Sequence, residues 1–281
     1  MATTKTSSPV HAEMPRRSRR GVVVAVAVVV VVLVILGGFV IWDRTARRAG
    51  PANPGTNCPQ VVKARSRPPL AAIGVHRVAL IGDSIMWQAS CAIANSLAGV
   101  GIETSRRAYP GTGLLTGNDW VAETRRILAV DKPDIVLAIF VGNYFGPPAH
   151  TVSGAPIAFD SPEFFAAWQA RATELSAEVR AAHARLYWVS PPPVTLPSSA
   201  AARLFDGYRR IPGDRTLDSG RILAGPGNRY ITSKDSCGHP VRLRSVYDGV
   251  HLSDDGARIY GQQIAHDLSL QLGILATPRP C

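Results

Sequence analysis

The sequence predicts an α/β fold, a three-layer α/β/α sandwich with a central parallel sheet over residues 71–281, preceded by one transmembrane helix. Two observations predict the sandwich: short apolar runs alternate with amphipathic helical segments, and polar motifs follow where the runs end. A third predicts the transmembrane helix, because residues 21–42 form an apolar run without a charge.

The first 70 residues predict a membrane anchor and a linker. Residues 1–20 are polar and basic, and we expect them in the cytoplasm. At about 1.5 Å per residue, a helix over residues 21–42 could cross a hydrocarbon core of about 30 Å. A cleavable signal peptide is the alternative, but its apolar region usually runs only about 7–15 residues. Residues 43–70 are rich in Pro, Gly and Arg, so they predict a linker to a domain outside the membrane.

The distribution of charge argues against nucleic-acid binding. The formal net charge is +11, but eleven of the 31 Lys and Arg residues lie in residues 1–70, with only two acids. Residues 71–281 hold 20 basic and 18 acidic residues and are nearly neutral. The basic residues flank the apolar run, where they are typical of residues that orient a membrane helix and not of a surface that binds DNA or RNA.

Four cysteines leave two interpretations open. Cys58, Cys91, Cys237 and Cys281 contain no CxxC pair, so no zinc site of the common spacing is predicted. An even count suits disulfides in an oxidising compartment, and four cysteines allow three pairings. Buried free thiols are the other interpretation, above all for Cys91 in an expected helix.

Three short, mostly apolar runs predict buried strands, and a more polar segment between them is expected to add a fourth strand. The expected strands cover Val75–Ile81, Ile102–Ala108, Asp134–Val141 and Leu186–Val189. Because strands alternate with helices, we expect parallel pairing with an active site beyond the carboxyl ends of the strands.

Helical segments separate and follow these runs. A helix over Ile85–Leu97 should stop near Gly99, and another covers Trp120–Val130. Ser161 and Ser253 are expected N-caps of two later helices. The helix after Ser161 carries the stripe Phe165, Trp168, Ala172, Leu175 and Val179; the helix after Ser253 carries Ala257, Tyr260, Ile264 and Leu268.

Ser84 is the first candidate for chemistry. It comes shortly after the expected strand Val75–Ile81 and directly before the expected helix Ile85–Leu97, so it lies where backbone N–H groups and the positive end of the helix dipole are available. A hydroxyl there can attack a carbonyl carbon, and its own N–H can bind the oxyanion that develops. An isolated serine in this position is usually only a helix cap.

A base for that serine is found near the other end of the chain. Asp248 lies three residues before His251, just ahead of a helix, so its carboxylate can hold the Nδ1–H of the imidazole. The Nε2 atom of His251 is then free to accept the proton of Ser84. Taken alone, this spacing also fits a solvated turn.

Two loops after expected strands could complete an oxyanion hole. One contains Gly111 and Gly113, where glycine lets the backbone approach a substrate, and the other contains Asn143. In isolation each resembles an ordinary turn.

Together these motifs resemble the SGNH hydrolases, also called GDSL lipases and esterases. The resemblance runs from residue 75 to about 272 and is carried by VALIGDSI at Val78–Ile85 and DGVHLSDDGARIYGQQIA at Asp248–Ala265. It implies Ser84 as nucleophile, His251 as general base and Asp248 as the group that orients it. It also implies Ser84, Gly111 and Asn143 as oxyanion donors, with Gly113 as an alternative to Gly111. Asp83 is expected to be structural.

The resemblance implies a serine-dependent carboxylic ester hydrolase outside the cell membrane. Its expected substrates are acyl esters, such as acetyl esters, of envelope glycans or lipids, and no cofactor or metal is expected. The same triad would serve an O-acyltransferase, and a non-catalytic envelope-binding protein is a third possibility. The sequence lacks GxxxxGK[ST] and HExxH motifs and does not predict an oligomeric state.

Overall fold

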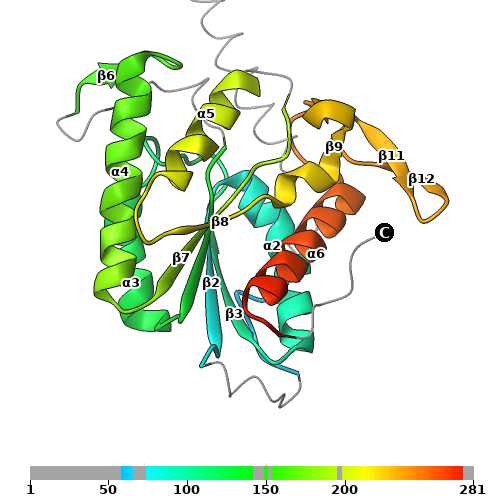
Figure 1. Cartoon of the computed structure of the whole chain (residues 1–281), viewed down its shortest axis with the longest axis horizontal. Helices are drawn as coiled ribbons and strands as arrows, with labels where there is room; N and C mark the ends of the chain where they lie inside the picture. Colours follow the sequence, from blue (N-terminus) through cyan, green and yellow to red (C-terminus); the bar gives the residue numbers. More distant parts are fainter. Residues whose placement is uncertain (1–57, 66–73, 142–148, 151–153, 195–197, 275–281) are drawn as a thin grey trace, which may run out of the picture. The chain divides into compact units, whose positions relative to one another are not determined.

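A computed structural model describes residues 58–65, 74–141, 149–150, 154–194 and 198–274 (Figure 1). The expected cytoplasmic tail, the expected transmembrane helix and most of the expected linker lie outside these residues. Within the described residues, no helix is long and apolar enough to cross a membrane.

A six-stranded sheet forms the centre of the domain, in the order β1-β3-β2-β4-β7-β8. Its strands are β1 (Val61–Val62), β2 (Arg77–Gly82), β3 (Glu103–Ala108), β4 (Ile135–Ile139), β7 (Arg185–Val189) and β8 (Arg215–Leu217). All neighbours pair in parallel except β1, which pairs antiparallel to β3. The α/β prediction is therefore confirmed, and the expected parallel sheet is mostly parallel.

Two strands of the sheet were not predicted. The expected linker at residues 43–70 contains β1, in which Val61 lies opposite Ser105 and Val62 lies opposite Thr104. At the other edge, β8 has three residues. Strands of two or three residues are too short to show a hydrophobic period, so they leave no signal in the sequence.

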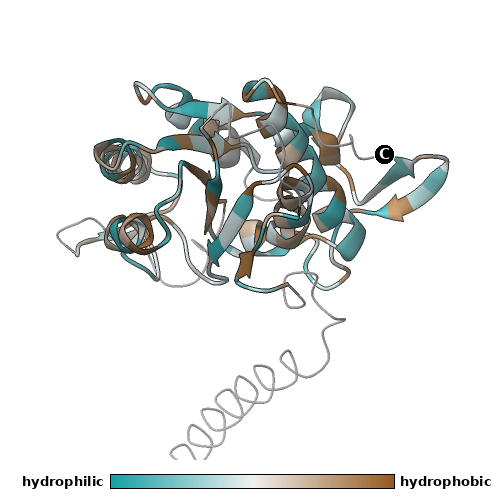
Figure 2. Ribbon diagram, turned by 90° about the horizontal axis from the view of Figure 1, so that it is seen from below, coloured by the Kyte–Doolittle hydropathy of each residue, from teal (hydrophilic) through white to brown (hydrophobic). Residues whose placement is uncertain are grey.

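Helices cover both faces of the sheet (Figure 1). They are α2 (Ser84–Gly99), α3 (Trp120–Asp131), α4 (Pro162–Ala181), α5 (Ser198–Arg209) and α6 (Asp254–Gln271). One face packs with α2 and α6, and the other with α3, α4 and α5, in two separate apolar clusters. Figure 2 shows hydrophobic residues concentrated in the sheet and in the helices beside it.

Smaller elements connect and extend these layers. They are β5 (Ala149–His150), β6 (Pro156–Ile157), η2 (Ser219–Leu223), β9 (Ala224–Gly225), η3 (Pro226–Asn228), β10 (Arg229–Tyr230), β11 (Ser233–Ser236) and β12 (His239–Arg242). The hairpin of β11 and β12 projects from the body of the domain (Figure 1).

The helix caps explain where α4 and α6 begin. Ser161 accepts a hydrogen bond from the N–H of Phe164, and Ser253 accepts one from Gly256, as expected for N-caps. The predicted apolar stripe of α6 is buried, but in α4 Phe164 is fully buried whereas Phe165 is only partly buried. The α2 helix ends two residues later than expected and includes Gly99.

The cysteines differ in state. Cys237 is disulfide-bonded. Cys58 and Cys91 are unbonded and half-buried, so for these two the free-thiol interpretation describes the structure. Cys281 lies outside the described residues.

We predict that Gly82→Ala prevents the turn after β2 from forming. Gly82 has a φ of +143°, and a Cβ there would lie 1.9 Å from the carbonyl oxygen of Ile139. Because that oxygen belongs to the backbone of the neighbouring strand, we expect the free energy of unfolding to fall by about 3 kcal/mol or more.

Gly99→Ala is the matched control. A Cβ at Gly99 meets nothing within 4 Å, so alanine should leave stability unchanged or raise it by up to about 1 kcal/mol. Urea denaturation measures both variants, and equal stability of the two would contradict the prediction.

Candidate active site

The carboxyl ends of three neighbouring strands meet at one edge of the sheet. Gly82 at the end of β2 is in register with Ala108 of β3 on one side and with Ile139 of β4 on the other. The segments that follow these strands therefore leave the sheet side by side. They carry Ser84 and Gly111, two of the residues expected in the site.

Asp83 holds the turn that presents Ser84. Its Oδ1 accepts a hydrogen bond from the N–H of Ile85 at 2.9 Å, and its Oδ2 accepts one from the N–H of Val141 at 2.6 Å. Its backbone N–H donates to the carbonyl of Ile139 at 3.1 Å. Asp83 is 1% exposed, so its carboxylate is buried within backbone contacts rather than open to a substrate. It ties the start of α2 to the end of β4, and this agrees with the structural role expected for it.

Ser84 is the first residue of α2. Its side chain is half-buried at the edge of the sheet. The N–H groups of the first helical turn have no acceptor within the helix, and the positive end of the helix dipole lies there. Ser84 therefore combines a reachable hydroxyl with a local preference for negative charge.

The segment before α6 folds into a closed loop that carries Asp248 and His251. Arg244 and Leu252 form an antiparallel bridge at its base. Inside the loop the N–H of Ser245 donates to the carbonyl of His251 at 2.8 Å. The loop is thus held by its own backbone before any side chain of the site is considered.

A hydrogen-bond chain joins the two ends of the domain. The Nε2 atom of His251 lies 2.9 Å from the Oγ of Ser84, and its Nδ1 lies 2.6 Å from Oδ2 of Asp248. The other oxygen of Asp248 accepts the backbone N–H groups of Val250 and His251, each at 2.9 Å. The structure therefore brings together the three residues that the sequence predicted for a triad.

The surroundings keep Asp248 ionised. Partial burial acts to raise the pKa of its carboxyl, but the hydrogen bonds from His251 and Val250 outweigh burial and lower this pKa below its ordinary value. A carboxylate on Nδ1 selects the tautomer that donates from Nδ1 and accepts at Nε2. The side chains of His251 and Asp248 are 42% and 41% exposed, so the chain of bonds is open to a substrate.

Gln88 is a part of the site that the sequence analysis missed. It lies one turn after Ser84 on α2 and is buried, and its Oε1 accepts the N–H of Leu252 at 3.0 Å. Its Nε2 donates to the carbonyl of the same residue at 3.1 Å. Leu252 directly follows His251, so Gln88 fixes the backbone next to His251 against the helix that begins at Ser84. A glutamine four residues after Ser84, in an apolar helix face, was the available signal.

Tyr230 supports the loop from the other side. Its hydroxyl donates to the carbonyl of Gly249 at 2.7 Å, within the turn between Asp248 and His251. The sequence analysis did not find this residue either, because β10 carries no motif. The loop is therefore anchored on two sides by side chains from distant segments.

The structure distinguishes between two of the expected oxyanion donors. The N–H of Gly113 donates to the carbonyl of Thr116 at 2.9 Å and is therefore occupied. Gly111 is exposed, with a φ of +80°, and its N–H has no hydrogen-bond partner among the described residues. Gly111 is thus the better candidate of the two. Asn143 lies outside the described residues.

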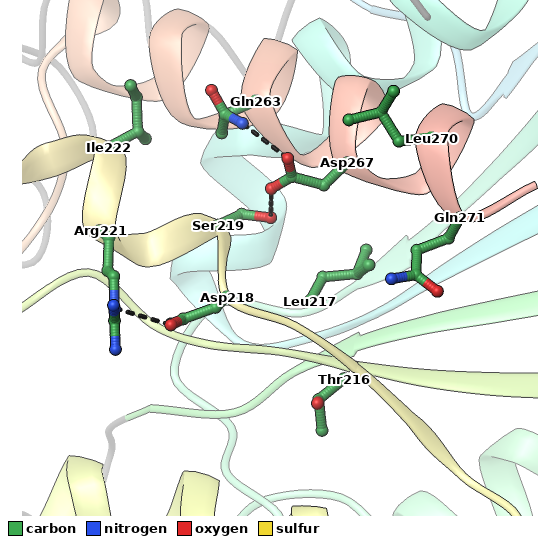
Figure 3. Close-up of a pocket in the computed structure, with 10 residues that line it drawn as sticks. All are labelled: Thr216, Leu217, Asp218, Ser219, Arg221, Ile222, Gln263, Asp267, Leu270 and Gln271. Carbon is green, nitrogen blue, oxygen red and sulfur yellow. Dashed lines mark hydrogen bonds and ion pairs between the residues drawn. The ribbon is translucent and has the colours of Figure 1, made fainter.

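A separate pocket of about 610 Å³ lies between β8, η2 and α6 (Figure 3). Its acidic groups have partners within the lining: Asp267 accepts from Ser219 and Gln263, and Asp218 pairs with Arg221 at 2.7 Å. None of the residues predicted for the site lines it. Across the described part of the chain, no group of three or more His, Cys, Asp or Glu residues is placed to hold a metal ion.

Known proteins match the part of the chain that contains the candidate site. A family model described as "Protein of unknown function (DUF459)" matches residues 77–267, from the start of β2 into α6. This match includes Ser84, Asp248 and His251. A search of the curated proteins found no match.

Several solved structures are similar to this chain. A protein of the lipolytic G-D-S-L family from Desulfitobacterium hafniense is 15% identical with a TM-score of 0.49, over 67% of this chain and 97% of that one. A psychrotrophic esterase from a Pseudoalteromonas species is 13% identical with a TM-score of 0.48, over 70% and 99%. An acetyl xylan esterase from Geobacillus stearothermophilus is 12% identical with a TM-score of 0.46, over 72% and 97%.

We predict that Gln88→Met lowers turnover of an ester substrate by between about tenfold and a hundredfold, because His251 loses its fixed distance to Ser84. The loss should fall on kcat more than on KM, since Gln88 is buried behind the site. Gln88→Glu keeps an acceptor for the N–H of Leu252 and should retain more of the ester turnover that the resemblance to SGNH hydrolases implies than Gln88→Met does.

The matched control is Gln271→Met at the exposed end of α6. Steady-state kinetics with a short-chain aryl ester measure all three variants. If Gln88→Met kept the kcat of the unmodified chain, the proposed role of Gln88 in fixing the position of His251 would be refuted.

Proposed function

We propose that this chain, which belongs to the DUF459 family of proteins of unknown function, is a serine-dependent carboxylic ester hydrolase. The observation that carries the proposal is the contact of 2.9 Å between Nε2 of His251 and Oγ of Ser84, with Asp248 bound to the other ring nitrogen. A neutral imidazole held in this way can remove the serine proton as the hydroxyl attacks an ester carbonyl.

The reaction proceeds through an acyl-enzyme. Ser84 Oγ attacks the carbonyl carbon while His251 takes its proton, and the resulting imidazolium is stabilised by Asp248. His251 then gives that proton to the leaving alcohol. Water, activated by the same base, attacks the acyl group and releases the acid.

Backbone donors would stabilise the oxyanion. We assign the N–H groups of Ser84 and Gly111 to this role, because Ser84 begins a helix and Gly111 has no hydrogen-bond partner in the described part of the chain. Asn143 is proposed as a third donor on the resemblance to SGNH hydrolases alone. Removing a donor of this kind typically costs about 10²–10³ in kcat.

The proposed substrates are acyl esters of envelope glycans or lipids. The support comes from the sequence, in which residues 21–42 form an uncharged apolar segment that would hold the domain at a membrane surface. Acetyl esters are the simplest members of this class. A triad that passes the acyl group to a sugar or lipid hydroxyl would make the chain an O-acyltransferase.

Ser84→Ala should reduce hydrolysis of a short-chain aryl ester by at least about a hundredfold, because the acyl-enzyme can no longer form. The assay uses the full chain in detergent. Ser96→Ala, on the same helix, is the control and should stay within about twofold of the unmodified chain.

Three outcomes separate the alternatives. Ester hydrolysis that depends on Ser84 supports the proposal. Poor hydrolysis with efficient transfer of the acyl group to an added glycan would favour the acyltransferase. No turnover of acetylated glycans, lipid esters or aryl esters would favour a non-catalytic binding protein.

We also propose that the N-terminus is cytoplasmic and that the domain lies outside the membrane. Five basic residues precede the apolar segment at residues 21–42, and three follow in residues 43–62. A C-terminal alkaline phosphatase fusion should therefore be active, because this reporter folds only in an oxidising compartment. An inactive phosphatase together with an active cytoplasmic reporter at the same position would reverse the topology.

A further inference from the structure

Two cysteines from distant parts of the chain meet beside the sheet. Cys58 lies just before β1, and Cys91 lies on α2, two turns after Ser84. Both are half-buried and unbonded, and a side-chain hydrogen bond joins them. Their closeness is therefore a property of the fold and not of sequence proximity.

One face of α2 is shaped to receive the segment around Cys58. Cys91, Ala94 and Ala98 are spaced three and four residues apart, so they share a helix face. Ala94 and Ala98 are fully buried and form a small apolar cluster with Val62, against which Cys58 packs. The small alanine side chains let the segment approach the helix closely, and Cys91 continues the same face toward Cys58.

A buried arginine forms hydrogen bonds on both sides of this contact. Arg106, on β3, is 9% exposed, and its Nε donates to the hydroxyl of Ser90 at 2.7 Å. Its Nη1 donates to the carbonyl of Cys58 and also to that of Pro59 at 3.3 Å. Because Ser90 directly precedes Cys91, a single guanidinium links the backbone carbonyl of Cys58 to the side chain next to Cys91.

The surroundings of Cys91 do not suit a reactive thiolate. Burial and, after it, the hydrogen bond with Cys58 raise the pKa of its thiol to about 12, and they outweigh the positive charge of Arg106, which acts to lower it. Nucleophilic and metal-binding cysteines need a lowered pKa and a nearby positive field strong enough to stabilise the thiolate. A pair of cysteines placed in contact, without those properties, is suited to a structural crosslink.

We propose that Cys58 and Cys91 form a disulfide that fastens the segment before the sheet to α2, the helix that begins at Ser84. Each thiol loses one hydrogen, and the two electrons reduce the disulfide of an oxidised thiol–disulfide oxidoreductase to its dithiol. The exchange passes through one mixed disulfide, and the second cysteine displaces the oxidoreductase. An oxidising location, as proposed for the domain, supplies such a partner.

The crosslink would stabilise the weakest edge of the sheet. The β1 strand has two residues and pairs only with β3. The chain before β1 leads back to the expected membrane segment at residues 21–42. Any force on the expected linker therefore acts on β1 before it acts on the rest of the sheet. A covalent bond from Cys58 to α2 would transfer that load from the two residue pairs between β1 and β3 to a helix of 16 residues.

Peptide mapping of the full chain tests the pairing. The chain is equilibrated in a buffer of reduced and oxidised glutathione, free thiols are alkylated, and the protein is digested without reduction. We expect one crosslinked peptide containing Cys58 and Cys91, with a mass two hydrogens below the sum of its parts. Alkylation of both cysteines, or pairing of either with Cys237 or Cys281, would overturn the proposal.

A double-mutant cycle tests the same bond without mass spectrometry. Under oxidising conditions Cys58→Ala, Cys91→Ala and the double variant should each lower Tm by a similar amount, about 5 °C or more, because each breaks the same crosslink. Added reductant also breaks the disulfide of Cys237, which all the variants keep, so under reductant the difference in Tm between the unmodified chain and these variants should disappear. Additive effects of the two single substitutions would contradict the crosslink.

Neither readout depends on ester turnover. A chain without esterase activity but with the Cys58–Cys91 peptide would refute the proposed function and leave the disulfide standing. An active esterase with both thiols alkylated would do the reverse.

Discussion

The hydrogen bond between His251 and Ser84 is the contact on which the rest of the site depends. The two residues lie 167 positions apart in the chain, and each is held in place by its own local structure. Ser84 is set by the turn that Asp83 binds to β4, and His251 is set by a loop closed on its own backbone. The contact exists only if the sheet and α6 place these two units within hydrogen-bond reach.

Gln88 connects these two local structures, the start of α2 and the loop that carries His251. Its amide donates to the carbonyl of Leu252 and accepts from the N–H of the same residue. The loop that carries His251 is therefore fixed in position relative to α2 by hydrogen bonds as well as by packing. An amide is well suited to this task because it offers a donor and an acceptor on one planar group. Two carboxylates in the same region have different tasks: Asp83 binds backbone N–H groups at both of its oxygens, whereas Asp248 binds the imidazole with one oxygen.

Much of the fold could be predicted from the sequence, and so could the three residues that meet in the proposed triad. Three of the four central strands, β2, β4 and β7, are mostly apolar runs, and Ser161 and Ser253 are caps with a clear local signal. Ser84, Asp248 and His251 were found because each lies at a junction between a predicted element and a loop. The alternation of strands with helices also predicted that these junctions share one edge of the sheet.

The remaining features depend on contacts between distant segments. The β1 and β8 strands are too short to show a period, and the roles of Gln88 and Tyr230 follow from partners far away in the chain. The choice of Gly111 over Gly113 needed the hydrogen bond from Gly113 to Thr116, which no spacing predicts. The contact between Cys58 and Cys91 likewise arises only when β1 pairs with β3.

Covalent labelling tests the central claim most directly. The unmodified chain and a His251→Ala variant are treated with a fluorophosphonate, and the adduct is located by peptide mass spectrometry. The account predicts one adduct, on Ser84, that forms at least about a hundredfold more slowly without the imidazole. An adduct on another residue, no adduct, or equal rates for the two proteins would contradict it.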